Sequence, residues 1–250
     1  MLNLIKMDLY RMFSMASFYV IICLFSIECV LMVYSSTMES DPLYLSIADL
    51  IMTTSIPFIT LFTGIFSALF LIADKSSQFI KNYGGQLKHR CSRIFSKIIC
   101  IIIYNILFSA ITILLLIVSD KIFKTNLELG FDADFFRYYA LAFLGNIAFC
   151  IVIVLISTLF KSTVPVVISP ILISTSVFSI IFSGVDNILH RIGIDFSTQK
   201  YMLSENIYNI YNLLWLEGSD NISFFVLLFL GYSIISAILS CIIFKKKDIA

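Results

Sequence analysis

Long runs of apolar residues recur along the chain, and they constrain its fold more than any other feature. A helix needs about 20 such residues to cross the hydrocarbon core of a bilayer. With 60% hydrophobic and 13% charged residues, the chain holds more apolar side chains than a soluble core of this size can bury. We therefore expect an all-α, polytopic membrane protein whose 250 residues form a single transmembrane domain. The predicted spans are 15–34, 50–72, 98–118, 138–160, 163–183 and 223–244.

The basic residues are distributed unevenly between the loops of this six-span arrangement. One set of segments carries twelve of the 17 Lys and Arg residues, whereas the other set carries five of them and twelve acids. The basic set is 1–14, 73–97, 161–162 and 245–250. The acidic set is 35–49, 119–137 and 184–222. Because cytoplasmic loops carry the excess of Lys and Arg, we expect both termini in the cytoplasm.

The residues before the first span have the pattern of an amphipathic helix. Leu2, Ile5, Leu9 and Met12 recur at helical spacing, with polar residues between them. The prediction is a short helix on the membrane surface. A frayed terminus is the alternative.

The segment between the second and third spans, 73–97, is the largest predicted internal loop. Its basic residues alone favour anchoring to anionic lipid. However, in its first half the apolar residues Phe79, Ile80 and Tyr83 are interleaved with the polar residues Lys81 and Asn82. This pattern predicts a short amphipathic helix that can contact a soluble partner. That half contains Gln78, Phe79, Ile80, Lys81, Asn82 and Tyr83. The pair Gly84-Gly85 then predicts a break, and the chain re-enters the membrane near Arg93 and Lys97.

In this segment the chain resembles the permease subunits of ABC-2 type transporters. These permeases carry an acid after their second span, then Gly-Thr-apolar-Lys-Asn, Ser-Arg and a Lys. The matching residues here are Asp74, Ile80-Lys81-Asn82, Ser92-Arg93 and Lys97. Two positions differ, since Asp74 stands where Glu is usual and Gln78 where Gly is usual. The six spans, the short 161–162 connection and the long segment before the last span also fit the family.

The resemblance implies that Gln78 to Tyr83 form a coupling helix that docks on a separate ATP-binding cassette ATPase, present in two copies. ATP and Mg would be bound by that partner, because the chain contains no GxxxxGK[ST] motif; the chain itself would bind no cofactor and be no enzyme. A second permease, identical or similar, would complete the transporter. The smallest such permeases expel antimicrobial peptides, as in lantibiotic immunity, from the bacterial plasma membrane. Docking and simple lipid anchoring both remain open.

Three further features are candidate sites. Glu28 is the one acid inside a predicted span. Its side chain either faces the bundle interior or a translocation path, or it lies in the outer third of the first span, where it is protonated or reached by water. Pro165 and Pro170 are expected to break or kink the fifth span. The family places short external helices after that span, and 206–218 has a helical apolar face. Whether this segment contacts a substrate is open.

Other function classes find little support in the sequence. His89 and His190 are the two histidines and neither has clustered ligands, so we expect no metal site. A net charge of +1 offers no basic face for nucleic acid. Intramembrane protease motifs are absent as well. A membrane scaffold or sensor partner without transport activity is the remaining alternative.

Overall fold

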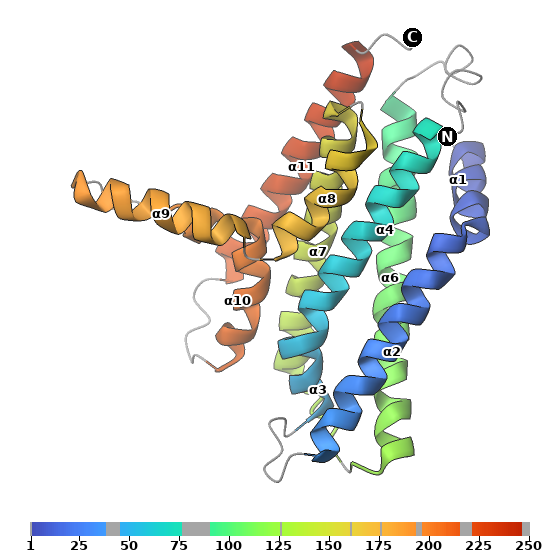
Figure 1. Ribbon diagram of the computed structural model, residues 1–250, viewed down its shortest axis with the longest axis vertical. Helices are drawn as coiled ribbons and strands as arrows, with labels where there is room; N and C mark the ends of the chain where they lie inside the picture. The colour runs from blue at the N-terminus through green and yellow to red at the C-terminus, as the bar shows by residue number, and fades with distance from the viewer. Residues whose placement is uncertain are drawn as a thin grey trace.

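The computed structural model describes residues 2–38, 46–76, 91–125, 127–160, 162–175, 177–193, 197–215 and 222–246. Within these ranges the regular structure is helical, apart from an isolated bridge between Ser46 and Glu128. The start of α1 and the end of α11 lie at the same end of an elongated bundle (Figure 1). The elements are α1 (Leu2–Ser14), α2 (Ala16–Met38), α3 (Ile47–Leu50), the π-helical η1 (Ile51–Ser55), α4 (Ile56–Ser76), α6 (Cys91–Phe123), α7 (Ala133–Leu159), α8 (Thr163–Ser174), α9 (Val177–Arg191), the 3-10 turn η2 (Gln199–Tyr201), α10 (Leu203–Trp215) and α11 (Ile222–Lys246).

Five helical segments within the described ranges are long and apolar enough to cross a membrane. They are Ala16–Ser35, Ile47–Ala73, Cys91–Phe123, Ala133–Leu159 and Ile222–Lys246. This confirms an all-α, multi-pass membrane protein and gives five of the six predicted spans. The predicted short connection at 161–162 also agrees with the structure, since α7 ends at Leu159 and α8 begins at Thr163.

The predicted span over 163–183 is divided into two helices in the structure, and the division lies beyond both prolines. Here α8 ends at Ser174 after 12 residues, or about 18 Å of helix, against about 30 Å of hydrocarbon. The Thr175 hydroxyl donates to the Ile171 carbonyl at 2.7 Å, and the Thr175 backbone leaves the helical region at φ −97 and ψ 71. The chain then enters α9, which points away from the other helices (Figure 1). The apolar composition of 163–183 concealed this break.

The second span begins with an irregular turn that its sequence explains. Ser46 caps α3 by accepting a hydrogen bond from the Asp49 backbone N–H at 3.1 Å. The π-helical turn η1 follows, directly before Pro57 near the start of α4. Proline lacks the N–H that would bond to the carbonyl four residues earlier. Widening the helix over the preceding turn accommodates that missing donor, so the span continues past Pro57 without ending.

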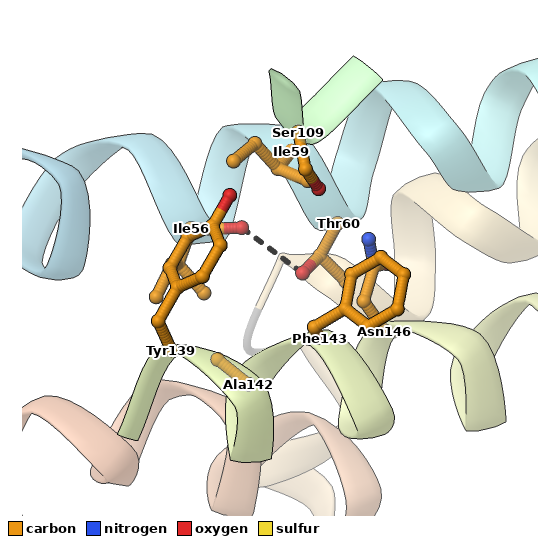
Figure 2. A pocket seen from close by; sticks show the side chains of 8 residues that line it. All are labelled: Ile56, Ile59, Thr60, Ser109, Tyr139, Ala142, Phe143 and Asn146. Carbon is orange, nitrogen blue, oxygen red and sulfur yellow. Dashed lines mark hydrogen bonds between the residues drawn. The ribbon is translucent and has the colours of Figure 1, made fainter. Parts of the chain in front are cut away.

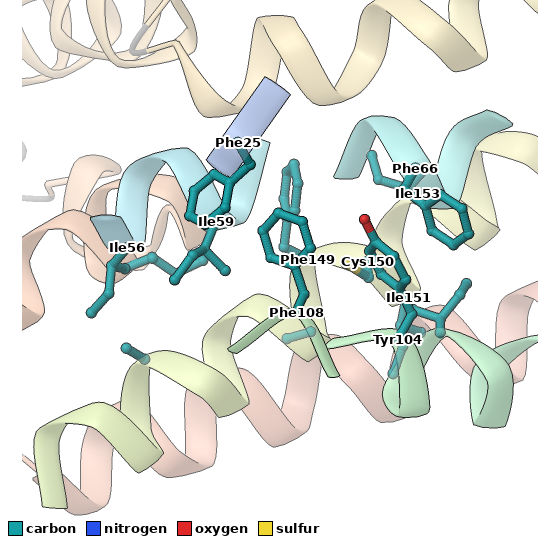
Figure 3. Close-up of a cluster of buried hydrophobic side chains, with 14 of the residues drawn as sticks. Phe25, Ile56, Ile59, Phe66, Tyr104, Phe108, Phe149, Cys150, Ile151 and Ile153 are labelled. Atoms are coloured by element: carbon teal, nitrogen blue, oxygen red, sulfur yellow. The ribbon is translucent and has the colours of Figure 1, made fainter. Parts of the chain in front are cut away.

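Aromatic side chains from α2, α4 and α6 form the centre of the bundle. The Phe66 and Tyr104 rings are stacked, with centroids 3.8 Å apart and an interplanar angle of 20°. Phe25 packs against Phe108 with centroids 4.6 Å apart, and all four residues are labelled in Figure 3. On the other side, α7 packs against α4, α10 and α11. Because these large side chains are fully buried, they fix α2, α4, α6 and α7 as one unit.

Gly64 sets the closest approach in this unit. A Cβ at Gly64 would lie 2.5 Å from Phe149 Cε1 on α7 and 2.9 Å from Pro170 Cβ on α8. A larger residue would therefore force the helices apart. Pro170, expected as a break, is instead a buried residue inside α8 that rests on this glycine. Pro165 lies in the first turn of α8, where a missing N–H costs little.

The third span is longer than predicted. α6 contains 33 residues and begins at Cys91, not at Ile98. Arg93 and Lys97, predicted as the end of a loop, therefore lie in the first two turns of a helix, and both are buried. Their charge suggested solvent exposure, but for Lys97 the Asp8 carboxylate on α1 makes burial possible.

The two segments predicted as amphipathic helices, at the N-terminus and at 206–218, are helical over their described residues. α1 covers the N-terminal pattern and packs against α6, although Leu2 on its predicted apolar face is exposed and Asp8 is buried. α10 contains the predicted 206–215 part, and Ile207 and Ile210 are buried where α10 packs against α7. Residues 216–218 lie outside the described residues. Neither packing follows from amphipathicity alone, which predicts an apolar face without saying what it meets.

Candidate functional site: a buried junction and a polar core

An ion pair joins α1 to the start of α6. The Lys97 Nζ atom lies 2.7 Å from Asp8 Oδ1, and the Ser96 hydroxyl donates to Asp8 Oδ2 at 2.6 Å. Lys97 Nζ also lies 3.9 Å from the centre of the Phe70 ring on α4. Asp8 and Lys97 are 2% and 3% exposed, so water contributes little to their solvation. We call Asp8, Phe70, Ser96 and Lys97 the Asp8 junction.

Because the Asp8 junction is buried, losing either charged partner would be costly. Both carboxylate oxygens of Asp8 have a partner, one a cation and one a hydroxyl. Removing one member of such a buried pair leaves an uncompensated charge and costs about 3–5 kcal/mol. The cation–π contact adds about 2 kcal/mol where it is desolvated. α1 is therefore firmly held against α6.

Two of the helices that form the Asp8 junction, α4 and α6, also flank the basic residues 77–90. α4 ends at Ser76 and α6 begins at Cys91, so the segment between them leaves from the helix of Phe70 and returns to the helix of Ser96 and Lys97. Both helices that flank residues 77–90 thus contribute to the junction. A force on that segment would reach α1, α4 and α6 through these four side chains.

A second polar cluster lies in the middle of the bundle. The Asn146 side-chain amide on α7 donates to Asn105 Oδ1 on α6 at 2.7 Å. The Thr63 hydroxyl on α4 donates to Asn146 Oδ1 at 3.0 Å, and Asn105 Nδ2 donates to the Ile101 carbonyl at 2.9 Å. All three side chains are buried. We call Thr63, Asn105 and Asn146 the asparagine network; it bridges three helices without any charge.

A small pocket adjoins the asparagine network. Its walls come from α4, α6 and α7, and Figure 2 shows the Tyr139 and Ser109 hydroxyls and the Asn146 amide around it. The Thr60 hydroxyl at the same place is used internally, donating to the Ile56 carbonyl at 3.0 Å. The complete lining is Ile56, Ile59, Thr60, Ser109, Tyr139, Ala142, Phe143 and Asn146. The pocket offers neutral hydrogen-bonding groups and no ionised side chain.

Glu28, predicted as a site residue, lies on α2. Both of its carboxyl oxygens are buried, and neither has a hydrogen-bond partner among the residues that the structure describes. Its neighbour Cys29 is fully buried in the core, whereas Ile27 is exposed. The side chain therefore lies at the edge of the bundle interior, and it forms no hydrogen bond to the Asp8 junction or to the asparagine network.

Most residues of the predicted coupling helix cannot be placed. Gln78, Phe79, Ile80, Lys81, Asn82, Tyr83, Gly84 and Gly85 lie outside the described residues. Asp74 lies in the last turns of α4, where the backbone is described. Of the residues predicted for this segment, Arg93 and Lys97 come together at the start of α6, and Lys97 enters the Asp8 junction.

A tyrosine outside the apolar spans ties α10 to α8. The Tyr208 hydroxyl donates to the Ser174 backbone carbonyl at the end of α8. Burial, and then the nearby Glu205 carboxylate, raise the pKa of Tyr208. The hydroxyl is thus a stable donor that holds α10 against the point where α8 ends.

Sequence reasoning missed the partners that complete these clusters. Asp8 was only one acid in a basic terminal segment, and Asn105 and Asn146 were polar residues within apolar runs. The signal for the asparagines was present, because amides inside a membrane span bond across helices. For Asp8 the helical spacing placed it beside Leu9 and Met12, but nothing indicated Lys97 as its partner.

No cluster of three metal-ligating side chains occurs within the described ranges. His190 is exposed on α9, and His89 lies outside the described residues. No family model matches the chain, and the search of curated proteins returned no match. The arrangement of helices and polar clusters is therefore the basis for a functional proposal.

Proposed function

We propose that this chain is the membrane-spanning permease subunit of an ABC-2 type transporter. It forms a translocation path together with a second permease, and two copies of a separate ATPase bind and hydrolyse ATP with Mg. The proposal locates it in a bacterial plasma membrane with both termini in the cytoplasm. The chain itself performs no covalent chemistry; it transmits motion from the ATPase to the spans.

The Asp8 junction is the observation that most supports this proposal. A transporter driven by a separate ATPase needs a rigid connection between the docking segment and the spans. Residues 77–90 follow α4 and precede α6; α6 meets α1 at the junction through Ser96 and Lys97, and Phe70 of α4 lies against the same Lys97. Displacement of the segment would move these helices as one body, because breaking the buried pair is costly.

The predicted docking segment supplies chemistry that suits a protein partner. Phe79, Ile80 and Tyr83 are apolar or aromatic, and such residues are common interface hot spots. Lys81, between them, suits the polar rim of an interface. Electrostatic anchoring to lipid needs only the charges, whereas a helix inserted in the membrane interface uses aromatic residues as well, so retention of the ATPase is what distinguishes docking.

Purification of the intact chain from its native membranes, followed by mass spectrometry, tests the proposal. We expect a polypeptide with a GxxxxGK[ST] motif to co-purify, and the complex in nanodiscs to hydrolyse ATP. The triple variant Phe79→Ala, Ile80→Ala, Tyr83→Ala should lose most of the bound ATPase. Retention of the ATPase by this variant would contradict docking through the segment.

Two controls separate the competing interpretations. Tyr19, Ile27 and Leu31 are exposed on α2, and replacing them with Ala removes a comparable apolar area without affecting docking. A variant with Lys81, Lys88 and Arg90 changed to Gln weakens lipid anchoring but leaves apolar contacts intact. If the wild-type chain stays monodisperse but retains no ATPase, the result contradicts the transporter proposal and favours the scaffold or sensor alternative.

For the transported compound we propose a cationic, amphipathic peptide such as a lantibiotic. The predicted external segments carry twelve acids and five bases, which would concentrate a cationic peptide at the surface. Cells producing the chain with its ATPase should survive several-fold higher concentrations of such a peptide. Equal sensitivity with and without the chain would exclude this substrate class.

A further inference from the structure

Two cysteines from distant parts of the sequence meet at the end of the bundle where α1 starts and α11 ends. Cys91 is the first residue of α6, and Cys241 lies near the end of α11. The Cys91 Sγ atom lies 4.0 Å from the Cys241 carbonyl oxygen, which places the two residues beside each other between α6 and α11. The other cysteines do not share this arrangement on two helices at one end of the molecule.

Accessibility distinguishes this pair from the rest of the cysteines. Cys91 and Cys241 are partly exposed, whereas Cys29, Cys100 and Cys150 are buried. Cys23 is exposed on α2, but the next cysteine on that helix, Cys29, is buried. Cysteines that respond to oxidants are accessible and lie beside a second thiol that can resolve the first oxidation product. Among the described residues, Cys91 and Cys241 meet both conditions.

Two lysines follow Cys241 on α11. Lys245 and Lys246 occupy the last turn of that helix. Lys245 lies four residues beyond Cys241 and therefore on the same face of α11. The charge of Lys245 favours the thiolate form of Cys241, which is the form that attacks a peroxide, and offsets part of the penalty of burying that anion.

We propose that Cys91 and Cys241 form a redox-sensitive dithiol, which hydroperoxides oxidise to an intramolecular disulfide that joins the start of α6 to the end of α11. One thiol loses its proton and the thiolate attacks an oxygen of hydrogen peroxide; the O–O bond breaks, a sulfenic acid forms, and the departing hydroxide takes up that proton and leaves as water. The second thiol attacks the sulfenic sulfur, which forms the S–S bond and expels a second water. Two thiols and one hydrogen peroxide thus give one disulfide and two waters.

This disulfide would restrict the bundle at one end. α6 and α11 pack against each other, and a covalent bond between Cys91 and Cys241 prevents their separation. The bond would also fasten the point where residues 77–90 rejoin the helices. The inference rests on the thiol geometry alone and holds whether or not an ATPase binds that segment.

The test uses the full chain in lipid nanodiscs, treated with hydrogen peroxide and then denatured and labelled with polyethylene-glycol maleimide. We expect the oxidised chain to accept two fewer labels than the untreated chain, with full labelling restored by a phosphine reductant. Mass spectrometry of the oxidised wild type should yield a tryptic peptide pair linked through Cys91 and Cys241. That measurement requires no variant to fold.

Single variants provide the matched comparison. Cys91→Ser and Cys241→Ser should each abolish the reversible loss of two labels, whereas Cys23→Ser should keep it. The proposal is overturned if peroxide leaves all six thiols reactive, if the loss of labels is not reversed by reductant, or if the linked species is a dimer on a non-reducing gel.

Discussion

The Asp8 junction and the asparagine network both join helices through buried polar groups, but they do so in different ways. The junction lies at one end of the bundle and uses a full ion pair between α1 and α6. The network lies in the middle and uses neutral amides and a hydroxyl on α4, α6 and α7. Both are shielded from water, so the difference lies in the charge of the groups.

This difference determines how each region can change. An ion pair in a dry environment resists separation, because either partner alone is strongly unfavourable. Neutral amides exchange partners at a lower cost, and hydrogen bonds between membrane helices contribute about 0.6 kcal/mol on average. The end of the bundle is thus suited to transmit a displacement, whereas its middle is suited to rearrange.

The largest effect should follow from unpairing the junction. Lys97→Met leaves the Asp8 carboxylate buried beside Ser96 without its cation, and we expect a loss of about 3–5 kcal/mol in the free energy of unfolding. Denaturant titration of the chain in mixed micelles measures this loss.

The double variant Asp8→Leu, Lys97→Met is the control for that experiment. It removes both charges and keeps apolar volume, so most of the stability should return. If the double variant is as unstable as the single one, the ion pair is not what holds α1, and packing around Met12 is the better explanation.

Next in size is an effect on packing beside the asparagine network. Gly64→Val places atoms where Phe149 and Pro170 already lie, and overpacking costs about 1–3 kcal/mol. Gly231→Ala on α11 is the matched control, since a Cβ there meets nothing within 4 Å, and it should stabilise the helix by up to about 1 kcal/mol. Equal effects of the two changes on thermal stability would show that α4 does not approach α7 and α8 this closely.

A smaller effect is expected from the network itself. Asn146→Leu removes the hydrogen bonds to Asn105 and Thr63, and we expect a cost of about 0.6–1.7 kcal/mol. Combining it with Asn105→Leu gives a double-mutant cycle, in which the second change should cost less than it does alone. A loss as large as that of Lys97→Met would remove the distinction between the two regions.

The smallest effect should come from the hydrogen bond between α10 and α8, which lies outside both regions. Tyr208→Phe removes the hydrogen bond to the Ser174 carbonyl, worth about 0.5–1.5 kcal/mol. Because burial and Glu205 raise the pKa of Tyr208, its contribution is full below the unfolded value of about 10 and declines as the pH rises above it. The stability difference between wild type and variant should therefore shrink in alkaline solution; a difference that grows with pH would contradict this assignment.

Hydropathy was enough to predict the fold class and most of the spans. The residues of α2, α7 and α11 are predominantly apolar over at least 20 positions, and such runs have few alternatives to a membrane helix. The same uniformity hid the end of α8 at Ser174, since hydroxyl bonding to a carbonyl and a change in backbone direction leave the composition unchanged.

The candidate site was predictable only in part. Lys97 was selected because of its place in a motif and a basic segment, but its burial depends on Asp8, 89 residues away in the sequence. Such pairing is a tertiary contact that periodicity cannot encode. The same holds for Asn105 and Asn146, where the sequence predicts a need for partners but not their identity.

Photo-crosslinking in intact cells from a benzophenone amino acid at position 83 tests the central claim most directly. If residues 77–90 transmit force from an ATPase to the Asp8 junction, the adduct should join this chain to a polypeptide with a GxxxxGK[ST] motif. The same probe at Tyr19, which is exposed on α2, should give lipid adducts. Lipid adducts alone at position 83, in a chain that inserts normally, would contradict the proposed coupling.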